Sequence, residues 1–344
     1  MATTRSFTNA FEMVDYTSEL LVVPNQWSVL NDIGLFEEQG VAQNTVTFEE
    51  INKSLGLIGD QVRGTKPQAG QDYTRKIRAY SIPHFPYVDA IRPQDVQGKR
   101  AYGSDQVETV DAVMARKLER MRWSFDATLE VARWKTLADG TLYAPNGTIA
   151  GNLYADFGIT RKSVNFALGT GTTDIIGRVE EVIAWMQDNQ NSGDVVTLID
   201  GFASPQFFAS LISHPKVQAA YQYYTATTGQ QIQRSRAGNS EGVAGGLHRV
   251  FEYGGIRFTE VRSQLAGTKF VADGTCIFVP RGTRDNFVTY FGPADKFGYE
   301  NQIGVSAYAW TYRDPKNEAI EIEGQSNFIN LIRRPQMVVT GTVA

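Results

Sequence analysis

The sequence is poor in the residues that most often build reactive sites. Its 344 residues include one cysteine and three histidines. A single cysteine excludes a disulfide framework within the chain, and Cys276 lies in the apolar run CIFVP, which indicates a buried side chain. His84, His214 and His248 stand in unrelated contexts without metal-ligand spacing. We therefore expect no metal site, no cofactor and no catalytic residue.

Long apolar runs and an excess of positive charge are also missing. No run approaches 18 apolar residues, so no membrane-spanning helix is expected, and the N-terminus lacks the hydrophobic core of a signal peptide. The net charge of −4 argues against tight nucleic-acid binding, which depends mainly on basic contacts to phosphate. The composition is that of a globular protein, which we expect to be made in a reducing cytosol.

Glycine-rich and acidic stretches are present, but none completes a catalytic motif. The segment GTGTTD at 169–174 lacks the lysine of a phosphate-binding loop. The acid pairs Glu180/Glu181 and Glu321/Glu323 fit a solvated helix face and an alternating strand. A β-rich hydrolase that uses an acidic pair stays open as an alternative of another class. Such an enzyme would be a monomer or small oligomer with a pocket.

The most regular stretch runs from Ser104 to Gly140 and predicts one long helix at 105–138. Apolar residues recur every three or four positions and form one side of the helix: Val107, Val110, Met114, Leu118, Met121, Phe125, Leu129 and Ala132. The other side carries Arg116, Lys117, Arg120, Arg122, Glu130 and Arg133. We expect Asp105 and Glu108 to cap the start and Gly140 to end the helix. Such a helix needs an extended surface to pack on.

Residues 1–44 predict an arm rather than a compact domain. Between Phe7 and Glu50 there are eight acidic residues and no lysine or arginine. The apolar clusters of this segment are short and are interrupted by Pro24 and Gly34. We expect the arm to lie on another surface and to take its order from neighbouring subunits.

Residues 45–90 predict an extended β-hairpin loop. TVTFEEIN at 45–52 has strand propensity, a second strand begins at Arg75, and the excursion between them is rich in glycine. So long a loop inside a compact domain is usually functional or disordered. From Lys53 to Arg78 there are six basic and two acidic residues, so this segment has the opposite charge to the arm.

The rest of the chain mixes helices with many strands. TLYAPNGTIAGNLY predicts a hairpin that turns at Asn146-Gly147. Residues 173–190 predict an amphipathic helix whose apolar face carries Ile176, Val179, Val182, Ile183 and Met186. Residues 204–224 predict another helix, with Pro205 in its first turn, and most of the remainder alternates as strands. The pattern indicates an α+β fold rather than regular βαβ repetition.

A series of short motifs then occurs in an order and spacing that are specific as a set. They are FFASLISHPKV at 207–217, GGIRFTEVR at 254–262, PRGTRDNFVTYFGPAD at 280–295, YRDPK at 312–316 and GQSNFINLIRRPQMVV at 324–339. Together with TLEVARWKTLADGTL at 128–142, these motifs resemble the major capsid protein E family of lambda-type tailed bacteriophages. One departure is Val261-Arg262-Ser263, where the family would have Tyr-Arg-Gly.

The resemblance implies the Hong Kong 97-type capsid fold and a structural function. Its parts would be an N-terminal arm at 1–44, the extended loop at 45–90, a peripheral domain at 91–170 and 283–327 with the long spine helix, and an axial domain at 171–282 and 328–344. The chain would self-assemble into hexamers and pentamers of an icosahedral head in the virion, after synthesis in the bacterial host cytoplasm.

The resemblance also implies partners. The shell would enclose double-stranded DNA without sequence-specific binding, and would involve a scaffolding protein, a portal and a decoration protein. A covalent crosslink between subunits is disfavoured, because nothing indicates that the loop lysines Lys53 and Lys66 meet an asparagine. The nearest alternative is an encapsulin-type compartment, which has the same fold but packages enzymes.

The opposite charges of the arm and the hairpin lead to a hypothesis about contacts between subunits. The basic hairpin would lie over acidic surface of an adjacent subunit. The contact residues would be Leu55, Leu57, Ile58, Arg63, Lys66, Arg75, Lys76 and Arg78 on the hairpin and Glu37, Glu38, Glu49 and Glu50 on the acidic side. Exposed ion pairs contribute only about 0–1 kcal/mol each. They would therefore set orientation, and the apolar residues would anchor the contact.

Overall fold

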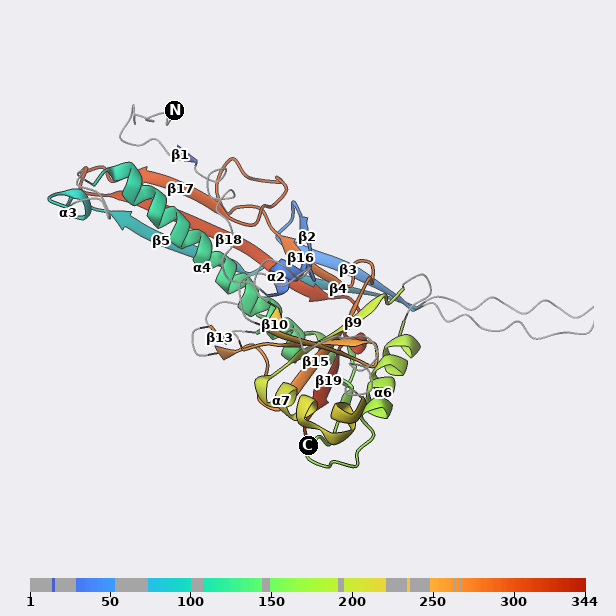
Figure 1. Cartoon of the computed structure of the whole chain (residues 1–344). Helices are drawn as coiled ribbons and strands as arrows, with labels where there is room; N and C mark the ends of the chain where they lie inside the picture. Colours follow the sequence, from blue (N-terminus) through green and yellow to red (C-terminus); the bar gives the residue numbers. More distant parts are fainter. Residues whose placement is uncertain are drawn as a thin grey trace, which may run out of the picture.

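The structure is a computed structural model, and it describes residues 14–15, 29–52, 74–99, 108–143, 149–190, 195–220, 234–235, 248–262, 264–265 and 268–344. Figure 1 shows an elongated layer, in which a long helix runs beside long strands, joined at one end to a second sheet with its own helices. Among the described residues, no helix is both long and apolar enough to cross a membrane.

The elongated layer is a six-stranded sheet in the order β1-β17-β18-β16-β2, with β5 also paired to β18. Its strands are β1 (Val14–Asp15), β2 (Glu37–Gly40), β5 (His84–Ile91), β16 (Phe287–Phe291), β17 (Tyr308–Arg313) and β18 (Ile320–Ile332). The first part of β18 pairs with β17 and β5, and its last five residues pair with β16. This long strand therefore ties the whole sheet together.

The long helix is α4 (Val110–Asp139), which packs against β18 and β5. The predicted stop at Gly140 is confirmed, because this residue has a φ of +67° and its N–H donates to Thr136 O. The predicted start at Asp105 is wrong: the described helix begins at Val110, and the side chain of Thr109 caps it by accepting from Ala112 N. Glu108 instead forms an ion pair with Arg116, at 3.1 Å.

Most of the predicted apolar side of α4 is confirmed. Met114, Leu118, Met121 and Phe125 are buried against Ile91, Ala309 and Ile322 of the sheet and against Ala307, which directly precedes β17. Leu129 and Ala132 are buried further along. Val110 is exposed, and Val107 lies outside the described residues. Glu130 and Arg133 were predicted on the polar side, and this is wrong because both are buried.

The two strands of the predicted hairpin are confirmed as β3 (Thr45–Asn52) and β4 (Thr74–Ser81), which pair antiparallel with each other. Figure 1 shows this pair extending away from both sheets. The next strand, β5, follows after two residues and pairs with β18 over eight positions. The second half of the 45–90 range therefore turns back into the six-stranded sheet.

The second sheet has seven strands in the order β10-β11-β12-β9-β15-β19-β8. They are β8 (Ser163–Asn165), β9 (Leu198–Ala203), β10 (Arg234–Ser235), β11 (His248–Tyr253), β12 (Ile256–Glu260), β15 (Thr275–Arg281) and β19 (Val339–Thr342). β12 and β9 are parallel, as are β19 and β8, and the other pairs are antiparallel. Interspersed helices and a mixed sheet confirm the predicted α+β class.

Helices α6 (Ile175–Asp188) and α7 (Pro205–Ser213) pack on one face of this sheet through a cluster that includes Phe207, Phe208 and Phe278. Ile176 was predicted on the buried face of α6 but is exposed. The helix predicted at 204–224 is interrupted, because His214 precedes Pro215 and a residue before proline disfavours the helical conformation. Helical structure resumes at 215–220.

The remaining described elements are short. They are α2 (Leu30–Ile33), α3 (Pro93–Val96), β6 (Thr141–Tyr143), β7 (Ile149–Asn152), α5 (Leu153–Phe157), β13 (Gln264–Leu265), β14 (Thr268–Lys269) and the 3-10 helix at Pro335–Met337. β6 and β7 pair antiparallel and confirm the strands of the predicted hairpin, whose turn lies outside the described residues.

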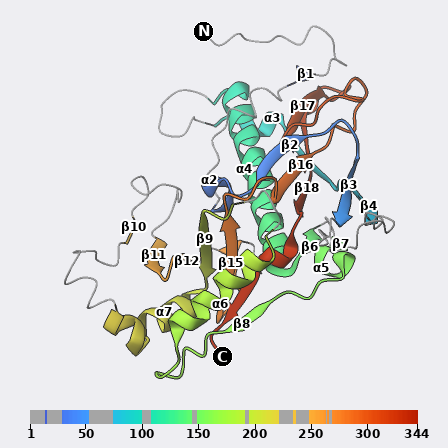
Figure 2. The ribbon, with the colours of Figure 1, turned by 90° about the vertical axis from the view of Figure 1, so that its right-hand side faces the viewer.

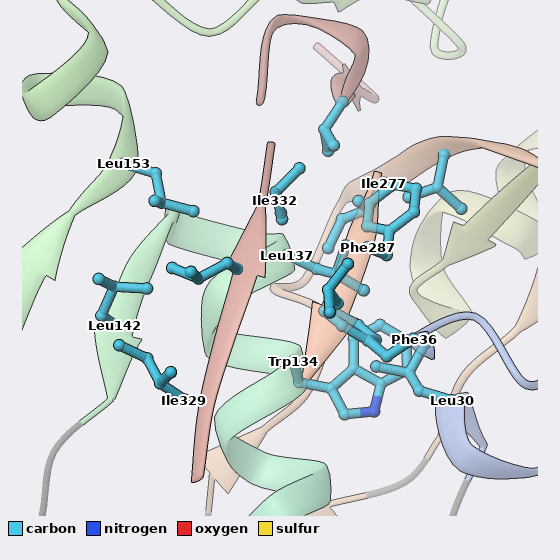
Figure 3. Packing of buried hydrophobic residues seen from close by; sticks show 14 of the residues in the cluster. Leu30, Phe36, Trp134, Leu137, Leu142, Leu153, Ile277, Phe287, Ile329 and Ile332 are labelled. Carbon is cyan, nitrogen blue, oxygen red and sulfur yellow. The ribbon is translucent and has the colours of Figure 1, made fainter. Parts of the chain in front are cut away.

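One apolar core joins the two sheets at the end of α4. It brings together Phe287, Ile329 and Ile332 of the first sheet, Phe202 and Ile277 of the second, Trp134 and Leu137 of α4, and Leu30 and Phe36 from the N-terminal part of the chain. Figure 3 shows the side chains of Leu30, Phe36 and Phe287 gathered around Trp134. The last turns of α4 therefore lie where both sheets meet.

Candidate assembly surfaces

Residues 29–41, which we call the anchored segment, contact α4 through backbone N–H groups. The N–H groups of Val29 and Leu30 donate to Glu130 Oε1 at 3.0 and 2.9 Å. The indole Nε1 of Trp134 donates to the same oxygen at 2.8 Å. Glu130 is only 2% exposed. Its carboxylate therefore accepts hydrogen bonds from the backbone N–H groups at the start of α2, which have no partner within the helix.

Arg133 makes a second connection to the anchored segment. Its guanidinium forms an ion pair with Glu38 at 2.9 Å, and it also donates to Asn31 and to Thr289 of β16. The side chain of Arg133 is 1% exposed. Burial lowers the pKa of Arg133, and the neighbouring carboxylates of Glu38 and Glu130 oppose this change. Burial raises the pKa of Glu130, against the three N–H groups that favour its charged form.

The anchored segment also joins the six-stranded sheet. Its strand β2 runs parallel to β16, and Val41 N donates to Phe291 O at 2.8 Å. Arg281 of the second sheet donates to Ile33 O at 3.0 Å. We expected residues 1–44 to take their order from neighbouring subunits, and this is wrong for residues 29–41. These residues pack on α4 and on both sheets of their own chain.

The residues proposed for contacts between subunits fall into three groups. Leu55, Leu57, Ile58, Arg63 and Lys66 lie outside the described residues. Glu37 and Glu38 belong to β2, where Glu37 is exposed and Glu38 pairs with Arg133 of its own chain. Glu49, Glu50, Arg75, Lys76 and Arg78 belong to the hairpin itself.

The register of the hairpin pairs one acidic position with one basic position. Glu50 lies directly opposite Lys76, and Glu49 lies opposite Ile77. Glu49 and Glu50 are therefore part of the hairpin rather than of the arm. From the sequence we assigned the acidic residues to the arm and the basic residues to the hairpin. For Glu49 and Glu50 this assignment is wrong, because they lie on β3 and the basic residues lie on β4 of the same hairpin.

The base of the hairpin is fixed to the body of the chain. Val46 and Tyr80 are buried in the shared core, and Tyr80 OH donates to Asp156 Oδ2 at 2.8 Å. Burial and this hydrogen bond raise the pKa of Tyr80. The guanidinium of Arg78 lies 4.6 Å from the ring centre of Phe157. Arg78 therefore contacts its own chain, whereas the neighbouring Ile77 is exposed.

The described residues contain no group of three histidine, cysteine or acidic side chains that could hold a metal ion. Glu181 pairs with Lys162 at 2.8 Å, and Glu323 pairs with Lys296 at 2.5 Å, so one member of each acid pair is held in an ion pair. Cys276 is buried, and burial raises the pKa of its thiol.

The fold has a counterpart among solved structures. The chain superposes on the structure of the capsid of Ralstonia phage GP4 with a TM-score of 0.52, covering 100% of this chain and 99% of that chain at 11% identity. At this identity the likeness concerns the fold alone. The two-sheet architecture around a long helix is thus one that a phage capsid chain also adopts.

The sequence comparisons identify the family. The pattern of the family described as phage major capsid protein E matches residues 12–343, and this chain belongs to that family. The major capsid protein of Pseudomonas phage KPP10 is 42% identical over 350 residues, covering 98% of this chain and 99% of its own. The major capsid protein of Salmonella phage Felix O1 (isolate Felix O1-VT1) is 29% identical over 360 residues, with 98% and 97% coverage. The family resemblance read from the motifs is confirmed.

Proposed function

We propose that this chain is the shell subunit of a tailed-phage head and has the Hong Kong 97-type fold. In this reading the six-stranded sheet with α4 is the peripheral domain, and the seven-stranded sheet with α6 and α7 is the axial domain. The extended loop is the β3–β4 hairpin, and the arm comprises the residues before it. Copies of the chain associate as hexamers and pentamers and enclose double-stranded DNA.

The observation that supports self-association best is the β3–β4 hairpin. Its two strands pair with each other, and in the described part of the chain no third strand joins them. An isolated two-stranded hairpin is marginally stable in water. A ring of identical subunits would place such a hairpin on the body of the next subunit, as a heterologous contact that can close with different rotations.

The charge of the chain is compatible with a container for DNA. A net charge of −4 gives no general attraction for phosphate, so packaged DNA would not be held tightly by the shell. Scaffolding, portal and decoration proteins are the further partners that the family resemblance suggests. The names of the two relatives favour a phage shell over an encapsulin-type compartment.

Assembly of the full chain tests this function directly. We expect the purified chain, or the particle that contains it, to sediment as closed shells and to show hexagonal and pentagonal units by electron microscopy. A chain that stays monomeric under all assembly conditions would contradict the proposal. Particles that hold enzymes rather than DNA would instead favour the encapsulin-type alternative.

The charge hypothesis for the hairpin needs a separate variant. The double substitution Arg75→Glu/Lys76→Glu should lower the yield of shells at low salt, and high salt should reduce the difference from wild type. Arg78 is left unchanged because it contacts Phe157 of its own chain. Lys216→Glu/Lys316→Glu, at two exposed positions outside the hairpin, provides a control with the same change in charge. Equal yields for the two double variants would refute a specific role for the hairpin.

A further inference from the structure

The connection between β16 and β17 carries the most exposed large apolar side chain of the described residues. Phe297 is 96% exposed, and Ile303 on the same connection is 71% exposed. Single exposed apolar residues are common on protein surfaces. Phe297 differs from such residues because the loop that carries it, residues 293–305, is fixed at both ends. We call these residues the presenting loop.

Lys296, directly before Phe297, fixes the first end of the presenting loop. Its ammonium group contacts Glu323 Oε2 and Tyr312 OH, each at 2.5 Å. It also lies 5.1 Å from the ring of Trp310 and 4.7 Å from that of Tyr312. Burial lowers the pKa of Lys296, but the bonds to Glu323 and Tyr312 outweigh this effect and raise it overall. The lysine therefore stays charged and bound to the sheet.

Gly304 fixes the second end of the presenting loop. Gly304 N donates to Val41 O at 3.0 Å. Gly304 also lies so close to the carbonyl groups of Phe291 and Gly292 that any side chain at this position would overlap them. Tyr299 accepts a hydrogen bond from Trp310 Nε1 at 3.1 Å, which holds the middle of the loop. The presenting loop therefore has little freedom to fold Phe297 back.

The presenting loop covers the face of the sheet that α4 does not cover. Along β17, Tyr308 and Trp310 pack with Ala294 of the loop, whereas Ala309 packs with the apolar side of α4. In Figures 1 and 2 the loop is the orange-brown segment that stands outside β16 and β17, away from α4. Phe297 belongs to this loop, and its side chain is exposed.

The surroundings of Phe297 favour a protein as the occupant. Asp295 and Glu300 are exposed beside it, while Lys296 is committed to Glu323. Gly298 N donates to Glu300 Oε2 at 2.7 Å, and the two carboxylates keep this position acidic. Their negative charge disfavours nucleic acid or an anionic membrane here. An apolar centre with a polar rim is the usual arrangement of protein–protein contacts, and aromatic anchors carry much of their binding energy. An anchor on a fixed loop also loses little freedom on binding.

We infer that Phe297 anchors a contact between two copies of this chain, and that the presenting loop holds it ready for that contact. The inference rests on the proposed shell function, because a shell supplies a second copy at high local concentration. It goes beyond that function in assigning one surface and one side chain to the association. Decoration or scaffolding proteins are the other possible occupants, and the experiment separates them from a second copy.

The test compares Phe297→Ala with Val195→Ala in the full chain. Val195 is 64% exposed and precedes β9 of the second sheet, so it provides a matched loss of an exposed apolar side chain. Both variants should unfold at the same temperature as wild type, because neither side chain is buried. Phe297→Ala should lower the yield of particles from purified chain alone by about tenfold or more, as expected for an anchor residue, and Val195→Ala should leave it unchanged.

A third variant tests whether fixing the loop matters. Glu323→Gln removes the charge that holds Lys296 and keeps Phe297, so its yield should fall between those of wild type and Phe297→Ala. Amide hydrogen exchange at 297–303 in the unassembled chain should become faster in this variant. Unchanged exchange and unchanged yield would overturn the presenting role of the loop.

Hydroxyl-radical footprinting of the native chain gives a direct readout that no substitution can disturb. Phe297 should be oxidised in the unassembled chain and protected in particles formed from this chain alone. If particles form and Phe297 stays fully reactive, or if Phe297→Ala assembles like wild type, the contact is overturned while the shell function stands. If protection requires an added decoration or scaffolding protein, the contact between copies is likewise overturned. If wild type never assembles, both proposals fail.

Discussion

The two halves of α4 bury different kinds of side chain. From Val110 to Phe125 the buried residues are apolar and lie on strands β5, β17 and β18. From Asp126 to Asp139 the buried residues include Glu130, Arg133 and Thr136 as well as Trp134 and Leu137. The first half rests on a sheet whose backbone groups are already paired. The second half receives the anchored segment, which brings unpaired N–H groups and therefore needs an acceptor.

This difference shows how one helix serves two purposes. The first half behaves as a support for a flat sheet, where apolar contact is sufficient. The second half joins three parts of the chain, since Glu130 binds the anchored segment, Arg133 binds β2 and β16, and Trp134 packs against Phe202 of the second sheet. The substitutions below should affect the two halves in different ways.

Glu130→Ala should have the largest effect. It leaves two backbone N–H groups and an indole N–H without their acceptor inside the core. It also removes one of the carboxylates near Arg133, which keeps its ion pair with Glu38. Breaking a buried charged network typically costs about 3–5 kcal/mol. Urea unfolding of the unassembled chain measures the loss, and hydrogen exchange at 29–36 should increase. Arg120→Ala, at an exposed position of α4, is the control and should change stability little. A loss below about 1 kcal/mol for Glu130→Ala would show that the anchored segment does not depend on this carboxylate.

Met121→Ala should give a comparable or smaller loss in the first half. Met121 is fully buried, and Gly324 lies against its sulfur without room for a side chain. Replacing a buried methionine by alanine costs about 2–5 kcal/mol. Unlike Glu130→Ala, this change should not open residues 29–36 locally. Their amide hydrogens should exchange only as fast as global unfolding of the variant allows. Selective release of residues 29–36 by Met121→Ala would refute the separation between the two halves.

The pH dependence of Glu130→Gln should reveal the buried charge. The folded pKa of Glu130 is raised above its ordinary value of 4.5. The contribution of this group to stability is therefore fully present below pH 4.5 and is lost as pH rises through the folded pKa. Glutamine resembles the protonated acid, so the stability of wild type relative to Glu130→Gln should fall as pH increases. Parallel stability curves measured by urea unfolding from pH 4 to pH 8 would contradict a raised pKa.

Thr109→Ala should have the smallest effect, because it acts only at the exposed start of α4. Loss of the hydroxyl that accepts from Ala112 N should cost about 1 kcal/mol. Thr109→Ser keeps this acceptor and should restore most of the stability in the same unfolding experiment. Equal losses for the alanine and serine variants would show that the cap does not set the start of the helix.

The sequence predicted what depends on local pattern. The periodic spacing of Met114, Leu118 and Met121 identified the helix and its buried side, because neighbours on one helix face decide it. Glycine at 140 identified the end, since the residue after a helix often needs a positive φ. The family followed from motifs that were weak alone and specific together.

The sequence could not predict what depends on distant partners. Glu130 and Arg133 were assigned to solvent because the segment that binds them lies about a hundred residues earlier in the chain. The one local signal was an acid and a base three positions apart, beside Trp134, at the end of an apolar stripe. The exposure of Phe297 was equally hidden, because it results from the way Lys296 and Gly304 fix the presenting loop.

Cryo-electron microscopy of particles assembled from the full chain tests this account most directly. It shows which segments pack on their own subunit and which contact a neighbouring subunit. We predict closed shells in which residues 29–41 lie on Glu130 and Arg133 of their own subunit, while the β3–β4 hairpin lies on the adjacent one. A chain that forms no shell, or shells in which the hairpin rests on its own sheets and residues 29–41 bind α4 of a neighbour, would contradict this assignment.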